Sequence, residues 1–154
     1  MVALHAGRTD VSTNSIESMK RNQIVPRGIR NRNPLNIRIG NVWLGEVDHP
    51  TDPEFEQFCT FEYGIRAGFI ILRRYIRRYG HNTIRSIISH WAPSSENDTE
   101  AYITAVSRAV QLEPDAIIDY GDKATMVALV DAMILHECGE HVPLPSIIKG
   151  YERA

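Results

Sequence analysis

Apolar residues recur at helical spacing in the chain from residue 62 onward. The segment 62–80 ("EYGIRAGFIILRRYIRRYG") places four of them on one face: Ile65, Phe69, Leu72 and Ile76. Its arginines fall mostly on the opposite face, and Gly80 supplies a stop signal. This pattern predicts an amphipathic helix with one buried side.

Four further segments predict helices. Residues 82–92 begin with an asparagine cap and end before Pro93, and residues 94–112 begin with a Ser, Asn or Asp cap. Residues 122–139 are the most apolar segment, and residues 143–154 form a last short helix. The expected buried stripes are Tyr102, Val106 and Val110 in the second segment, and Met126, Leu129, Val130, Met133 and Ile134 in the third, which Gly139 should end.

The N-terminal part of the chain has no helical period. Residues 1–26 are polar and aperiodic and predict a flexible arm. In residues 36–44, "NIRI" and "VWL" flank a Gly-Asn pair, which is typical of a β-hairpin. A proline-broken loop follows up to residue 60. We therefore predict an α+β fold that is mainly helical, with one small hairpin and a single domain over residues 27–154.

Composition and charge limit the class of protein and the partners that the chain can have. The chain has 154 residues, 43% hydrophobic residues and a net charge of −2, which suits one globular domain and gives no sign of a nucleic-acid partner. Its two cysteines form no disulfide framework. The N-terminus lacks a secretory signal and no apolar run could span a bilayer. We expect synthesis in the cytoplasm and no stable membrane insertion.

The segment "LHECGEH" (residues 135–141) offers three chemistries. A helical zinc motif needs histidines four residues apart, whereas His136 and His141 are five apart with a glycine between them, so we expect no metal. Cys138 is a candidate nucleophile, although a helix C-terminus disfavours a thiolate. Glu137 is a candidate general acid, because the same helix end and an apolar wall disfavour its ionised form. The alternative to a catalytic role is that Glu137 is simply a solvated residue at the end of a helix.

Three segments resemble enzymes that cleave bacterial cell walls. "AMILHECGEHVP" resembles the catalytic helix of lysozyme-like transglycosylases and phage muramidases, with Glu137-Cys138-Gly139 where Glu-Ser-Gly is usual. "NPLNIRIGNVWLGE" resembles the Asn-x-x-Gly-Ile…Trp-x-Gly hairpin of bacterial glucosaminidases, with Asn36 at the glycine position. "HWAPSSENDTEAYITAV" resembles their Tyr-Ala-Thr-Asp-Pro…Tyr segment, with Trp91 in place of the first tyrosine.

From about Arg27 to the end, these motifs together resemble a family of small phage-encoded proteins of the virion-associated or lysis type. The glutamate helix precedes the hairpin in the glucosaminidases and comes last here, which we interpret as a circular permutation of lysozyme-like elements. The Glu137 helix should then pack beside the hairpin, with a cleft between them.

The resemblance implies an enzyme, a muramidase or a lytic transglycosylase, that cleaves peptidoglycan glycan strands with Glu137 as its general acid and without a cofactor. Glu46 and Glu62 are candidates for a second carboxylate. The expected substrate-binding residues are Asn33, Asn36, Trp43, Trp91, Glu96, Asn97, Thr99 and Tyr102. Turn, cap or core roles are the alternatives for these eight.

The expected partner is peptidoglycan, together with an inhibitor or immunity protein. A lysis system, a virion or a secretion machine would deliver the protein to the cell wall or periplasm. Two rival functions stay open: a non-catalytic virion or wall-binding module, and a Cys138-dependent amidase that cuts stem peptides.

Overall fold

A computed structural model describes residues 24–154 of the chain. It contains a short helix and five longer ones: α2 (Arg27–Arg30), α3 (Phe61–Arg78), α4 (Ile84–Trp91), α5 (Thr99–Val110), α6 (Lys123–Cys138) and α7 (Leu144–Arg153). The arm predicted for residues 1–26 lies outside the described residues up to position 23. No helix within the described part is long and apolar enough to cross a membrane.

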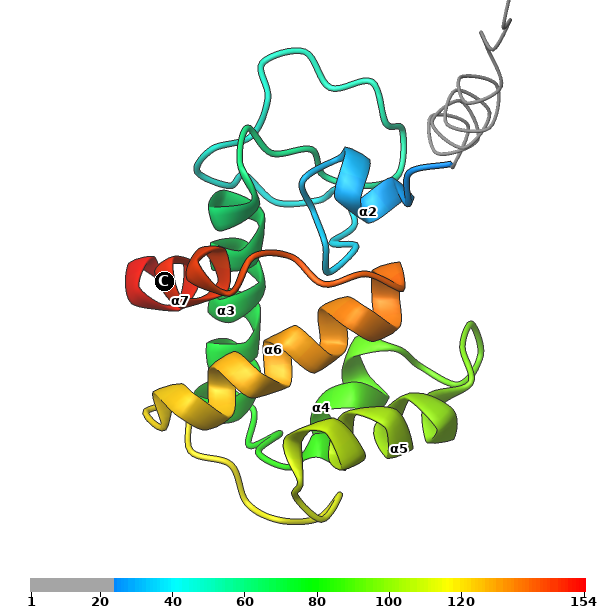
Figure 1. Cartoon of the computed structure of the whole chain (residues 1–154), viewed down its shortest axis with the longest axis vertical. Coiled ribbons are helices and arrows are strands. Elements are labelled where there is room, and N and C mark those ends of the chain that lie inside the picture. Colours follow the sequence, from blue (N-terminus) through cyan, green and yellow to red (C-terminus); the bar gives the residue numbers. More distant parts are fainter. Residues whose placement is uncertain (1–23) are drawn as a thin grey trace, which may run out of the picture.

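Helix α6 is the centre of the fold. It packs against α5, α7 and α2, while α7 also crosses and packs against α3 (Figure 1). The stripe predicted for α6 is confirmed, because all five of its residues are fully buried. Ile65, Phe69 and Leu72 of α3 are also fully buried, and Ile76 is partly buried.

The local signals at the helix ends agree with the sequence. Asp98 and Asp122 each accept a backbone hydrogen bond as N-caps of α5 and α6. Gly139 ends α6 in a left-handed conformation with φ 69°, as predicted. Helix α4 is capped by Thr83 instead of the expected asparagine, through a capping box with Ser86.

The prediction of an α+β fold with a β-hairpin is wrong. Residues 24–154 contain no strand and no sheet; three isolated bridges join Arg38 to Phe55, Glu46 to Phe58 and Thr83 to Ile117. The two predicted strands do not pair with each other, since Ile39 N donates to Glu54 O and Glu56 N donates to Ile37 O. Val42 and Leu44 are exposed. The interpretation as a circular permutation of lysozyme-like elements depended on this hairpin, so the structure removes its basis.

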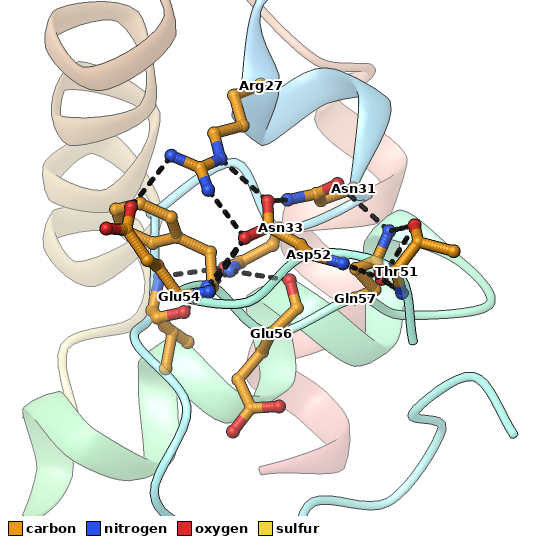
Figure 2. A network of polar contacts seen from close by, with 10 residues as sticks. Arg27, Asn31, Asn33, Thr51, Asp52, Glu54, Glu56 and Gln57 are labelled. Carbon is orange, nitrogen blue, oxygen red and sulfur yellow. Dashed lines mark hydrogen bonds and ion pairs between the residues drawn. The ribbon is translucent and has the colours of Figure 1, made fainter. Parts of the chain in front are cut away.

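Side chains hold the irregular segment 31–60 in shape. The Arg27 guanidinium donates to both oxygens of Asp52 at 2.6 and 2.7 Å, and Asn31 donates to the same carboxylate at 2.7 Å (Figure 2). Two backbone N–H groups, of Glu54 and Phe55, complete the shell around Asp52. These bonds replace a sheet ladder, so a long loop keeps one conformation.

Replacing Asp52 by asparagine is expected to lower the free energy of unfolding near neutral pH and to matter less in acid. The Arg27 guanidinium holds the pKa of Asp52 far below its usual range. The carboxylate therefore stabilises the fold fully above its unfolded pKa of about 3.9, and this stabilisation declines as the pH falls toward the folded value. Urea unfolding of both proteins at about pH 7 and about pH 3 measures the effect. A difference that stays constant over this range would contradict the assignment.

Candidate functional site

Glu137 lies in the last turn of α6, and both of its carboxylate oxygens accept hydrogen bonds from other segments. Asn36 Nδ2 donates to Oε2 at 3.0 Å, and the Tyr102 hydroxyl donates to Oε1 at 3.2 Å. The residue is half-buried. Three parts of the chain, the loop after α2, helix α5 and the end of α6, thus hold one carboxyl group in a fixed direction.

Asn36 supports this contact through an uncommon backbone conformation. Its φ is 52°, in the left-handed region that asparagine tolerates better than most residues with a Cβ. In the glucosaminidase pattern this position is a glycine, which suits the same backbone. Asparagine keeps the turn and adds an amide that reaches Glu137.

The loop after α2 comes close to the end of α6 because Gly28 has no side chain. A Cβ at this position would lie 2.7 Å from both Asn36 Oδ1 and Cys138 Sγ. The segment expected to form a hairpin therefore does lie against the Glu137 helix, although as a loop.

Tyr102 is 2% exposed, and its ring stacks on His136 with centroids 3.9 Å apart. Burial, and then the neighbouring Glu137 carboxylate, raise the pKa of its hydroxyl far above the usual value. Tyr102 therefore stays protonated and remains a hydrogen-bond donor to Glu137 over the physiological pH range.

Cys138 and the two histidines of "LHECGEH" point to other partners. The Cys138 thiol is buried and donates to Pro34 O at 3.2 Å. Burial, followed by Glu137 and Glu140, raises the pKa of this thiol to about 11, so little thiolate exists at neutral pH. His141 contacts Asp131 at 3.0 Å while His136 covers Tyr102, and no metal-binding group of three His, Cys, Asp or Glu residues occurs within residues 24–154.

If the protein cleaves peptidoglycan, as the resemblance implies, replacing Cys138 by serine is expected to leave the activity within a factor of about two of the wild type, because a protonated buried thiol with a backbone acceptor is a packing group. Serine can donate the same hydrogen bond to Pro34 O. Initial rates on purified sacculi measure the result. A folded serine variant without activity, or inactivation by a thiol-alkylating reagent at neutral pH, would show that the thiol reacts.

A groove of about 380 Å³ begins at Asn36 and runs between the loop after α2, helix α3 and the end of α4. Its lining combines aromatic rings, amides and arginines: Asn36, Ile37, Arg38, Asn41, Ile71, Arg74, Tyr75, Tyr79 and Trp91. The volume is within the range of sites that bind small ligands. The groove and Glu137 therefore share Asn36 as a common residue.

The chain is 42% identical over 131 residues to Protein P5 of Pseudoalteromonas phage PM2, an alignment that covers 82% of this chain and 80% of that protein. The chain belongs to the Protein P5 family. No protein-family profile matches it. The name of the relative indicates a phage source and no activity.

Among the residues expected to bind substrate in this member of the Protein P5 family, three contact the groove or its rim, and Asn36 is one of them. Trp91 lines the groove, half-buried against Tyr75. Glu96 lies on the loop before α5 and forms a 3.7 Å ion pair with Arg38 across the groove's edge, with both side chains 63% exposed.

The other expected residues have structural contacts. Asn33 is fully buried and bonded to Ile37 and Glu56, and Trp43 packs against the core with its Nε1 buried. The Thr99 hydroxyl donates to Ala92 O at 2.6 Å, and the Asn97 amide is directed to Pro93 O at 3.4 Å. These four side chains support the turn, cap and core alternatives.

Neither candidate second carboxylate contacts Glu137 or its two donors. Glu46 accepts from Trp43 N at 3.0 Å and neighbours Glu56, whose pKa is raised by burial and then by Glu46. Glu62 forms ion pairs with Lys149 and Arg153 of α7 at 3.6 and 3.5 Å. Glu46 and Glu62 therefore lie outside the hydrogen-bonded group that Glu137 forms with Asn36 and Tyr102.

Sequence reasoning missed several residues of the site. Arg38, Tyr75 and Tyr79 line the groove, and His136 covers Tyr102. The spacing of Tyr75 and Tyr79, one helical turn apart, was a signal that they share a face. Nothing in the sequence shows which loop that face meets.

Proposed function

We propose that this protein cleaves the glycan strands of peptidoglycan, with Glu137 as the general acid. The observation that carries the proposal is the Glu137 carboxyl group, held by Asn36 and Tyr102 from two other segments and joined through Asn36 to an aromatic groove. An incidental carboxylate at a helix end would face solvent. A general acid must instead be positioned relative to the bond it protonates.

In the proposed reaction, protonated Glu137 donates its proton to the glycosidic oxygen as the bond to the sugar's anomeric carbon breaks. The two donors keep the carboxyl group aimed at one place, which saves the entropy of orienting it in the transition state. The resulting carboxylate then takes a proton from the attacking group. That group is water in a muramidase and a hydroxyl of the substrate itself in a lytic transglycosylase.

The groove suits a sugar chain. The faces of Trp91, Tyr75 and Tyr79 offer flat apolar surface, while Asn36 and Asn41 offer amide donors and acceptors for hydroxyl groups. Such mixed linings are typical of sites that bind amphipathic ligands. Membership in the Protein P5 family supports a phage setting, in which a virion or lysis system brings the enzyme to the cell wall.

The rival amidase reaction is less well supported, since the Cys138 thiol is buried, protonated and bonded to Pro34 O. The rival wall-binding module needs the groove but has no use for a carboxyl group fixed by two donors. Digestion of purified sacculi followed by mass spectrometry separates all three. Reducing or anhydro sugar ends support glycan cleavage, new amino groups indicate an amidase, and absence of products indicates a binding module.

A further inference from the structure

The groove beside Glu137 is basic. Two arginines, Arg38 and Arg74, line it, and none of its nine lining residues is an aspartate or glutamate. The whole chain has a net charge of −2, so this positive lining is a local feature. A basic groove favours an anionic ligand over a neutral one.

Both guanidinium groups are available to a ligand. Arg74 is exposed and forms no ion pair with another residue of the described chain. The Arg38 guanidinium lies over the Phe55 ring, 5.1 Å from its centroid. Its one ion pair within the described residues is with Glu96, at 3.7 Å and with both side chains 63% exposed. A contact of this length and exposure contributes little stability, so an incoming carboxylate can replace it.

The lining thus joins two recognition chemistries. Aromatic faces bind sugar rings, and guanidinium groups bind carboxylates in a planar, two-point geometry. In intact peptidoglycan, the sugar backbone is largely neutral and the carboxylates lie on the stem peptides. A neutral glycan would gain nothing from Arg74, which forms no ion pair within the described residues, or from Arg38, whose ion pair with Glu96 is long and exposed.

We infer that Arg74 and Arg38 bind stem-peptide carboxylates, so that the groove selects peptide-bearing glycan strands over uncharged ones. The inference rests on the proposed function, because it names the substrate feature that the same site recognises. Arg74 lies about one helical turn from the C-terminus of α3, next to Tyr75, and lines the groove together with Trp91.

The test uses the full chain carrying Glu137→Gln, which should bind strands without cleaving them. Soluble glycan strands are compared with matched strands whose stem carboxylates have been converted to primary amides, and calorimetry gives the dissociation constants. Unmodified strands should bind about fivefold more tightly, near the upper limit for an exposed ion pair. Adding Arg74→Gln should reduce this preference, and adding Arg74→Gln together with Arg38→Gln should remove it.

Arg77→Gln is the matched control. Arg77 lies on the same helix and loses the same charge, but its guanidinium sits over the Tyr120 ring, 5.0 Å from the centroid, and does not line the groove. It should keep the preference. Circular dichroism confirms that each variant is folded.

Equal affinity for both kinds of strand, or an equal loss in the Arg74 and Arg77 variants, would overturn the inference. Wild-type digestion of the amidated strands is measured in parallel. Cleavage of those strands without any binding preference removes only the inference about the arginines. Absence of cleavage on every strand removes the proposed function, while the binding data still decide whether the groove selects carboxylates.

Discussion

Replacing Glu137 by glutamine is expected to lower the rate of glycan cleavage by a factor of about 10²–10⁴, the usual contribution of a positioned general acid. Glutamine has the same size but cannot donate a proton of suitable acidity. It offers one acceptor oxygen where glutamate offers two, so only one of the donations from Asn36 and Tyr102 can be kept. We expect the free energy of unfolding to change by no more than about 1–2 kcal/mol.

Release of sugar ends from sacculi, measured as initial rates, gives the effect on cleavage, and urea unfolding gives the effect on stability. Glu140→Gln is the matched control, because Glu140 is an exposed carboxylate just beyond the end of the same helix. It should keep wild-type activity. A folded Glu137→Gln variant that cleaves at the wild-type rate would reject Glu137 as the acid.

Replacing Asn33 by alanine is expected to destabilise the protein by about 3–5 kcal/mol, because the amide satisfies three buried backbone groups. Asn33 Nδ2 donates to Ile37 O at 2.9 Å and to Glu56 O at 3.0 Å, while Oδ1 accepts from Ile37 N at 3.0 Å. Alanine leaves the buried Ile37 N–H and Glu56 O without a partner, while Ile37 O keeps only its bond from Glu56 N. The melting temperature should fall by roughly 10 °C.

Thermal unfolding followed by circular dichroism measures this effect, with Asn97→Ala as the control. Asn97 is exposed and has one long contact of 3.4 Å, so its loss should change the melting temperature by about 1 °C or less. The Asn33 variant distinguishes the two roles considered for this residue, structural support and substrate binding. If it keeps full stability and loses only substrate binding, Asn33 is a ligand-binding residue.

The helices could be predicted because their signals are local. Apolar residues at i, i+3 and i+4 place a stripe on one side of a helix wherever that helix packs, and the fully buried Leu129, Val130 and Met133 follow this rule. Caps act within one turn, which is why a Ser, Asn or Asp cap before α5 and the stop at Gly139 could be predicted. The position of Glu137 at the end of α6 follows from the same signals.

The segment 31–60 could not be predicted, because its contacts are with residues far along the chain. A Gly-Asn pair between short apolar runs is typical of a hairpin when each run finds its partner in the other. Here Asn33 occupies the backbone groups of Ile37, and residues 54–56 take the remaining ones. Asn33 bonds to Ile37, 4 residues away, and to Glu56, 23 residues away. The apolar and turn pattern of residues 36–44 gave no sign of either bond.

By itself, the sequence determined the helices, their buried faces and the place of one carboxyl group at the end of the most apolar helix. The tertiary structure alone decided that Asn36 and Tyr102 hold this group, that Cys138 is buried against Pro34, and that Arg38 and Arg74 share a groove. The physical reason is that helical period and caps depend on neighbours within a turn. A site depends on side chains that meet across about 35 to 100 residues, and that distance is closed only when the helices pack.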